Sequence, residues 1–134
     1  MSALIADMTR EIEALAASDA AVSATRKAAL EAAGLLKSAT ASLLEMMASP
    51  QPDRAMAVAV PYLRLCGYVV GGWLLAKSAA VAAQHKDGTD RDFYQGKVRS
   101  ALFYAEHVLP TVFGLARVVT GGSNSVVETD AALV

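Results

Sequence analysis

The sequence predicts an all-α protein, an antiparallel four-helix bundle whose long helices are kinked by proline. Hydrophobic residues make up 54% of the 134 residues. Much of that share is alanine, the best helix former because its side chain loses no entropy in a helix. Only four prolines and nine glycines interrupt the chain. Short polar connections make successive helices pack antiparallel, in up-down-up-down order, and the length predicts a single domain over residues 1–134.

The first helix is expected over about residues 3–17 and the second over about 20–48. Apolar side chains recur in the first at helical spacing: Leu4, Met8, Ile12 and Leu15. Ser18 and Asp19 separate the two helices, and either side chain can cap the second one. Gly34 lies inside the second helix, where glycine costs about 1 kcal/mol relative to alanine. We therefore expect a neighbouring helix to pack closely against Gly34.

The third helix is expected over about residues 53–85. Pro50 and Pro52 end the helix before it, because neither proline can continue a helix. Pro61 falls inside the third helix. A kink near Ala57, or two shorter helices that abut there, is therefore expected.

The fourth helix is expected over about residues 90–120, with a C-terminal tail over 121–134. In the turn before it, Gly88 is the expected cap of the third helix and Thr89 the expected cap of the fourth. Pro110 predicts a second kink. One apolar stripe follows this helix: Tyr94, Val98, Ala101, Ala105, Val108, Val112 and Leu115. A stripe this wide indicates either a bulky bundle core or a contact with another subunit or domain.

Six residues in the second half of the chain are candidates for an interface. They combine aromatic side chains with glycines that leave a helix surface bare: Gly67, Tyr68, Gly71, Trp73, Tyr94 and Tyr104. Gly67 and Gly71 have the small-x-x-x-small spacing that lets two helices approach closely. A flat strip that is open to a ligand or a flavin is the alternative interpretation of this spacing.

The charge and hydropathy of the chain exclude several classes of partner. A net charge of −1, from 12 basic and 13 acidic residues, gives no reason to expect nucleic acid or an anionic membrane. The 12 residues between Arg64 and Lys77 fall short of the ~20 that cross a bilayer, so no membrane span is expected. The single cysteine, Cys66, excludes an intrachain disulfide and suits a reducing, cytoplasmic compartment.

No catalytic, cofactor-binding or metal-binding constellation is expected. His85 and His107 are the only imidazoles. Glu106 and His107 are adjacent, and adjacent residues do not share a helix face, so they cannot form the paired ligands of a metal site in a bundle. The buried setting expected for Cys66 indicates an inert thiol.

Two segments and a short closing run resemble the extra helical domain at the C-terminus of a subgroup of acyl-CoA dehydrogenases. The first segment is Tyr62-Leu-Arg-Leu-Cys-Gly-Tyr-Val-Val-Gly-Gly-Trp-Leu-Leu-Ala-Lys77. The second is Asp92-Phe-Tyr-Gln-Gly-Lys-Val-Arg-Ser-Ala-Leu-Phe-Tyr-Ala-Glu-His-Val-Leu-Pro110. The run is Gly121-Gly-Ser-Asn-Ser-Val126, and the stretch over residues 3–49 is compatible with the preceding helices of that family.

The resemblance implies a module of a flavoprotein of fatty acid metabolism. Such enzymes oxidise acyl-CoA to enoyl-CoA: a carboxylate removes the α proton and FAD accepts the β hydride. The glutamate base, the flavin-binding domain and the acyl pocket belong to regions upstream of the helical domain. The resemblance therefore implies that this chain is non-catalytic by itself, that the remaining domains of the enzyme are its partners, and that it forms a homo-oligomer.

Two alternatives come from other classes of protein. The first is a free-standing helical enzyme or ligand-binding bundle that uses His85, His107, Glu106 and Cys66. It requires these groups to converge in one pocket. The second is an adaptor that associates with itself through Gly67 and Gly71.

Overall fold

The computed structural model of the chain is all-α. It describes residues 1–17, 19–85, 87–121 and 124–129, and these ranges contain no strand. The helices are α1 (Ser2–Ala14), α2 (Ala20–Ala48), α3 (Asp53–Ala57), α4 (Ala59–Ala82), α5 (Arg91–Phe103), the π-helical segment η1 (Tyr104–Val108), α6 (Thr111–Gly121) and α7 (Asn124–Val127).

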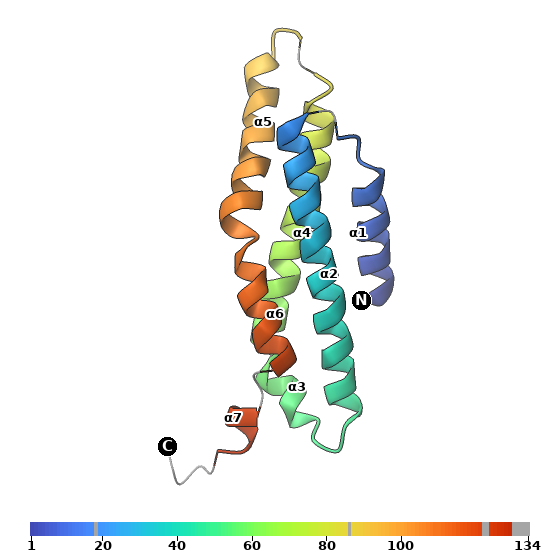
Figure 1. Cartoon of the computed structure of the whole chain (residues 1–134), viewed down its shortest axis with the longest axis vertical. Coiled ribbons are helices and arrows are strands. Elements are labelled where there is room, and N and C mark those ends of the chain that lie inside the picture. The colour runs from blue at the N-terminus through green and yellow to red at the C-terminus, as the bar shows by residue number, and fades with distance from the viewer. Residues whose placement is uncertain (18, 86, 122–123, 130–134) are drawn as a thin grey trace.

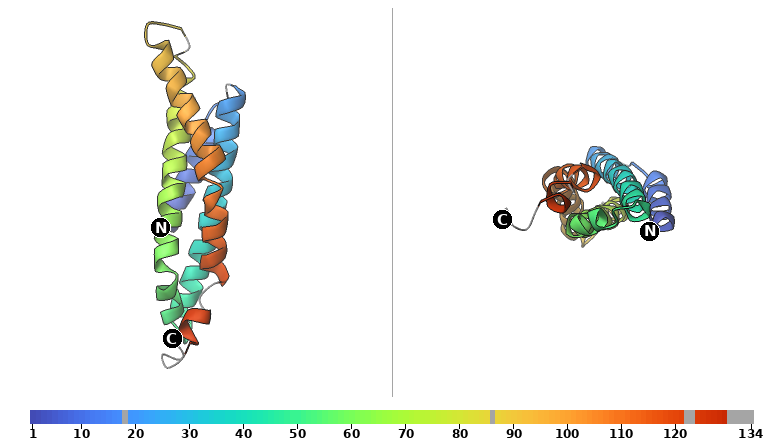
Figure 2. Two further views of the ribbon diagram at one scale, coloured as in Figure 1. Left: turned by 90° about the vertical axis from the view of Figure 1, so that its left-hand side faces the viewer. Right: turned by 90° about the horizontal axis from the view of Figure 1, so that it is seen from below.

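Three long rods form the body of the molecule: α2, α3 with α4, and α5 with η1 and α6. They run side by side, and successive rods point in opposite directions (Figures 1 and 2). The fourth element, α1, packs against α2 and α4. It has 13 residues where α2 has 29, so it accompanies α2 over only part of its length. The packing is consistent with the expected bundle, but one of the four rods is short.

The first helix ends at Ala14, three residues before the expected end. In the last turn of α1, two carbonyl oxygens accept from the side chain of Arg26 on α2: that of Ile12 at 3.0 Å and that of Glu13 at 2.7 Å. The carbonyl of Ile12 also accepts from the N–H of Leu15, the residue that follows α1, at 3.2 Å, and the guanidinium supplies the further donors that another helical turn would have supplied. Asp19 is the cap of α2, because its carboxylate accepts from the backbone N–H of Val22 at 3.0 Å.

Both internal prolines interrupt a rod. Pro61 would clash with the carbonyl of Ala57, and the chain breaks at Val58, between α3 and α4. Pro110 is accommodated by a π turn, in which the N–H of Leu109 donates to the oxygen of Tyr104, five residues back, at 2.9 Å. The rod bends by 43° between residues 91–108 and 111–121.

The expected end of the third helix and two expected caps were wrong. The third helix ends at Ala82, not at residue 85, and α5 begins at Arg91 with no side-chain cap, so Thr89 does not cap it. Gly88 lies six residues beyond the end of α4 and does not cap that helix. Its φ of 143° suits glycine and turns the loop between the two rods. Within the expected tail, residues 124–127 form α7.

The main core lies between α1, α2, α4 and α6. Its fully buried side chains include Met8, Ile12, Leu36, Leu65, Val69, Val112 and Val119. A second cluster near the loop between α4 and α5 is mostly alanine: Val22, Ala79, Ala80, Ala83 and Ala101. The stripe expected from Tyr94 to Leu115 is buried or half-buried throughout, which agrees with the interpretation of a bundle core.

The glycines differ in what surrounds them. A Cβ at Gly72 would lie 3.0 Å from both δ-carbons of Leu109, so this glycine lets the bent rod approach α4. A Cβ at Gly34 would have nothing within 4 Å, so the expected close packing against Gly34 was wrong. A Cβ at Gly67 would also meet open space.

Substituting alanine at Gly72 and at Gly67 is predicted to have opposite effects. Leu109 is 3% exposed, so its side chain has little room to shift, and Gly72→Ala should lower the free energy of unfolding by about 1–3 kcal/mol. Gly67→Ala removes the helix penalty of glycine in open space and should raise that free energy by up to about 1 kcal/mol. Urea unfolding of both variants measures this, and equal effects would contradict the close approach at Gly72.

Candidate interface around helix α4

The structure separates the six predicted interface residues. Tyr68, Gly71 and Tyr104 meet where η1 crosses α4, and Trp73 faces α1. Tyr94 lies at the end of the molecule near the loop between α4 and α5, where its ring stacks on that of His85 at 4.6 Å. Gly67 is exposed on the outer side of α4. They therefore do not form one continuous patch.

Tyr104 covers the glycine surface of α4. Its hydroxyl donates to the backbone oxygen of Tyr68 at 3.1 Å, and a Cβ at Gly71 would lie 2.6 Å from that hydroxyl oxygen. Burial raises the pKa of Tyr104, and the neighbouring Tyr68 adds to the increase. Because the phenol occupies the space above Gly71, the strip is not a flat surface that is open to a flavin. Gly71 serves a contact within the chain.

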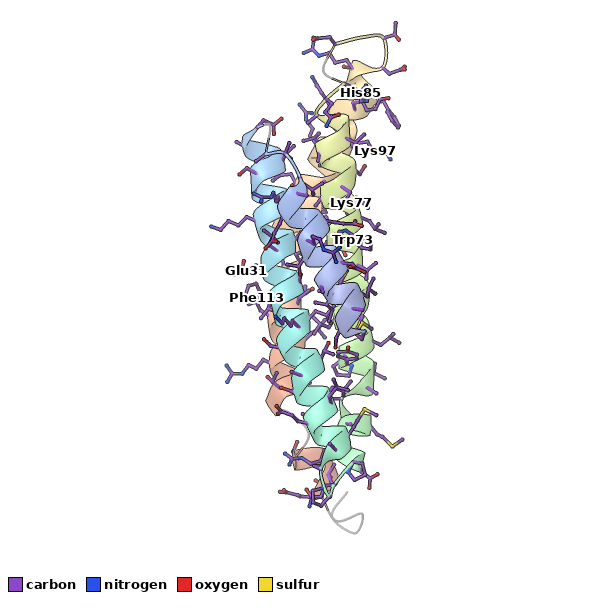
Figure 3. The ribbon with its side chains drawn as sticks, turned by 90° about the vertical axis from the view of Figure 1, so that its right-hand side faces the viewer. Glu31, Trp73, Lys77, His85, Lys97 and Phe113 are labelled. Carbon is purple, nitrogen blue, oxygen red and sulfur yellow. The ribbon has the colours of Figure 1, made fainter. Side chains whose placement is uncertain are left out.

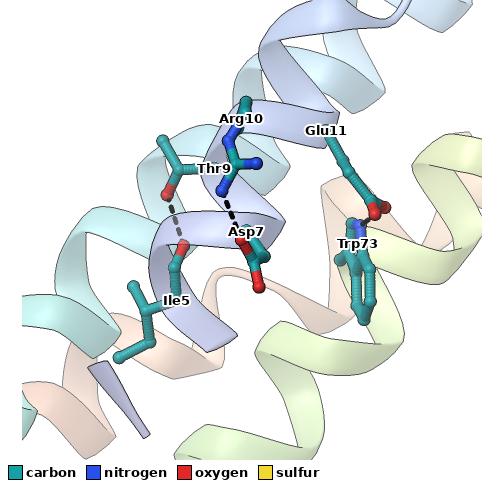
Figure 4. A network of polar contacts seen from close by, with 6 residues as sticks. All are labelled: Ile5, Asp7, Thr9, Arg10, Glu11 and Trp73. Atoms are coloured by element: carbon teal, nitrogen blue, oxygen red, sulfur yellow. Dashed lines mark hydrogen bonds and ion pairs between the residues drawn. The ribbon is translucent and has the colours of Figure 1, made fainter. Parts of the chain in front are cut away.

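Trp73 belongs to a polar cluster that joins α1 to α4. Its indole N–H donates to Oε2 of Glu11 at 3.1 Å, and Lys77 Nζ donates to the same oxygen at 2.7 Å (Figure 4 for Trp73 and Glu11). Lys77 Nζ also lies 5.0 Å from the centre of the indole ring, on the side of the molecule drawn in Figure 3. The hydrogen bond from Lys77 is the largest cause that lowers the pKa of Glu11, although the group is exposed. The cluster positions α1 on α4.

The groups of the catalytic alternative do not converge. His107 is exposed on η1, where its ring centre is 4.7 Å from that of Phe103, and His85 lies with Tyr94 at the end of the molecule. Cys66 is half-buried, and desolvation raises the pKa of its thiol above the usual 9.0. In the described ranges, no three His, Cys, Asp or Glu side chains are grouped so that they could hold a metal ion.

Two hollows lie away from α4's outer side. One, of 600 Å³, contains His85 and Tyr94, and its charged lining residues are Asp19, Asp87, Arg91 and Arg99. Two carboxylates and two guanidinium groups favour neither an anion nor a cation. The other is a groove of 740 Å³ between α1 and α2, with the bare surface of Gly34 and apolar side chains along it.

The outer side of α4 carries an exposed apolar row that the sequence analysis missed. We call these residues the α4 row: Val60, Leu63, Gly67, Leu74 and Val81. The side chains of Val60, Leu63, Leu74 and Val81 are 60%, 71%, 52% and 56% exposed. Their spacing of 3, 4, 7 and 7 residues is the signal that could have identified the row. The signal is weak because α4 is apolar on almost every side.

The length and composition of α4 would also allow it to cross a membrane. Of the described helices, α4 passes this test alone, and residues 91–108 with 111–121 pass it together as a bent pair. The core helix of a soluble protein passes the same test, and 39% of the apolar window of α4 is buried. The absence of a membrane span stays a prediction.

Comparison with known proteins gives matches along most of the chain. A family model described as "Acetyl-CoA dehydrogenase C-terminal like" matches residues 5–130. The chain is 38% identical over 77 residues to the broad-specificity linear acyl-CoA dehydrogenase FadE5 of Mycobacterium tuberculosis; the match covers 54% of the chain and 13% of that enzyme. It is 41% identical over 63 residues to 3-methylmercaptopropionyl-CoA dehydrogenase of Ruegeria pomeroyi, covering 46% of the chain and 11% of that enzyme.

The carboxylate of Glu11 is predicted to titrate below its usual 4.5 in the folded chain, because Lys77 stabilises its charged form. Its contribution to stability is then present above pH 4.5 and is lost as the pH falls through the lower folded pKa. Lys77→Gln should move the pKa back towards 4.5. Carbon-13 NMR titration of the side-chain carboxyl measures both values, and the same pKa in the two proteins would refute the α1–α4 cluster.

Proposed function

Because the chain belongs to the family of acetyl-CoA dehydrogenase C-terminal-like domains, we propose that it is a structural and interface module of a FAD-dependent acyl-CoA dehydrogenase. The resemblance predicted from the segments over residues 62–77 and 92–110 is confirmed. The observation that carries the proposal is the match over residues 5–130, together with relatives that the chain covers by only 13% and 11%. Most of each relative lies outside the matched region.

The enzyme of which this module is a part would oxidise acyl-CoA to enoyl-CoA, and the flavin would accept the hydride. The described residues of this chain do not fit FAD. Tyr104 covers the surface at Gly71, and the hollow around His85 and Tyr94 balances two cations with two carboxylates, whereas a pyrophosphate needs a cationic or N–H-lined site. In this proposal the chain therefore does not bind the flavin. Its role is to pack against other parts of the enzyme and to cover them.

In this proposal the module is an up-down-up-down four-helix bundle with three full-length rods and the short α1. It acts in the cytoplasm within a homo-oligomer, and its partners are the remaining domains of the dehydrogenase. The aromatic residues at the crossing of η1 and α4 support these contacts from within. They fix the direction of the bent rod, and therefore the surface that the module presents.

The alternative of a self-associating adaptor has less support. It required Gly67 and Gly71 to form one bare surface, but Tyr104 occupies the space above Gly71. A ligand-binding bundle is supported only by the apolar groove between α1 and α2. Neither alternative accounts for the family match over almost the whole chain.

A chimeric enzyme tests the proposed function. In the M. tuberculosis relative, this chain replaces the C-terminal region that corresponds to it. We expect the chimera to retain FAD and to oxidise acyl-CoA, and we expect deletion of the region to lower both. The matched control is the chimera with Leu36→Asp, which places a charge at a fully buried position and should behave as the deletion does. A deletion protein as stable and active as the intact relative would contradict the proposal.

A further inference from the structure

We propose that the α4 row is the surface on which an amphipathic helix from the rest of the acyl-CoA dehydrogenase docks, with acidic side chains beside its apolar stripe. This inference rests on the proposed function and specifies its contact surface. A helix that is apolar on all sides is ordinarily buried on all sides. In this chain α4 is covered by α2, by the rod of α5, η1 and α6, and by α1 at Trp73. The side between Trp73 and Gly71 carries the exposed side chains of the α4 row.

The shape of the row suits a helix. Its side chains follow a heptad-like spacing from Val60 to Val81, a span of 22 residues and about 32 Å at 1.5 Å per residue. Near the middle, a Cβ at Gly67 would meet nothing within 4 Å. Gly67 therefore leaves a hole between Leu63 and Leu74 that a large apolar side chain of a facing helix can fill. A docked helix would exclude water from four side chains that are each more than half exposed.

The row continues on α5. Val81 of α4 and Phe93 of α5, which is 61% exposed, line a hollow of 290 Å³ together with Lys77 and Lys97. Lys97 Nζ lies 5.3 Å from the centre of the Phe93 ring, and Figure 3 shows Lys77 and Lys97 one above the other along the same side. The upper end of the row is therefore apolar in its centre and basic at its edge.

The charges beside the row favour an acidic partner. The ion pairs among the described residues are Arg10 with Asp7 and Lys77 with Glu11, and neither includes Arg64 or Lys97. A helix with carboxylates beside its apolar stripe would pair with these two cations. A second copy of the chain is a poorer occupant. Helix α4 contains Arg64 and Lys77 but no Asp or Glu, so a second copy of α4 would bring no carboxylate of its own to pair with Arg64 and Lys97.

The relatives supply a source for such a helix. The matched segments cover 13% and 11% of their lengths, so most of each enzyme lies outside the part that corresponds to this chain. A module in this position needs a surface that faces the remainder of the enzyme. The α4 row, from Val60 to Val81, is exposed and apolar along almost the whole of α4, and it is therefore our candidate for that surface.

The test uses the chimeric enzyme and the isolated chain, each with Leu63→Lys, with Leu74→Lys or with the control Val118→Lys on α6. All three positions are exposed, so the melting temperature of the isolated chain should change by less than about 2 °C. In the chimera, the unsubstituted module should melt in one transition with the enzyme. In the chimera, Leu63→Lys and Leu74→Lys should each split this single melting transition into two, and the module should then melt at least about 4 °C below the rest of the enzyme. The chimera with Val118→Lys should keep the single transition. Arg64→Glu should also separate the melting of the module from that of the enzyme, whereas Arg64→Lys, which keeps the positive charge, should leave the single transition intact.

The outcomes separate this inference from the proposed function. If the unsubstituted chimera melts in two transitions and loses FAD, the proposed function itself fails. If it melts in one transition and the row variants do so as well, the docking surface lies elsewhere and this inference is overturned. A dimer of the isolated chain that Leu63→Lys dissociates would assign the row to a second copy. Cosedimentation with anionic phospholipid vesicles that Leu63→Lys abolishes would assign it to a lipid surface, and either result overturns the inference.

Discussion

The structure depends on how α4 is covered. This helix is apolar almost all round, so every side that another element does not cover leaves apolar side chains in water. The chain supplies α2 along its length, the bent rod of α5 and α6 on one side, and α1 on part of another. These elements bury Leu65, Val69 and Ala76 completely. They leave the α4 row open, and the proposed docking of a helix from the rest of the enzyme follows from that incomplete cover.

Two prolines set the geometry of this cover. Pro61 separates α3 from α4, and Pro110 replaces one helical turn of the last rod by a π turn. The π turn starts at Tyr104 and ends beside Leu109, the two side chains that lie against the adjacent glycines Gly71 and Gly72. The bend and the bare glycine surface therefore complement each other. Together they bring the bent rod onto α4. Its side chains cover the surface at Gly71 and Gly72, which is therefore closed to a flavin or to another helix.

Much of the fold is predictable from the sequence because its signals are local. Alanine content gave the all-α class, the two prolines gave both interruptions, and the carboxylate of Asp19 was one of two expected caps. The end of α1 was not predictable, because it depends on Arg26 of another helix. The surroundings of Gly34 and Gly67 were not predictable either, since a glycine in a helix has the same local pattern beside a neighbour and beside open space.

The candidate interface shows the same limit. Aromatic residues and glycines identified α4 and its surroundings, but Trp73, Tyr94 and Tyr104 proved to make contacts inside the chain. The exposed row was hidden because periodicity identifies a face only where polar residues mark the opposite face. On a uniformly apolar helix, the lengths and directions of the neighbouring helices decide which side stays open. Those are tertiary properties, and the short α1 is one of them.

Hydroxyl-radical footprinting of side chains tests most directly whether the rest of the enzyme covers α4. The labelling of Leu63 and Leu74 would be compared between the isolated chain and the chimeric enzyme, with Phe113 on α6 as the internal reference. If the rest of the enzyme covers α4, labelling of both leucines falls several-fold in the chimera while that of Phe113 is unchanged. Equal labelling of Leu63 and Leu74 in the two proteins, in a chimera that retains FAD, would contradict it.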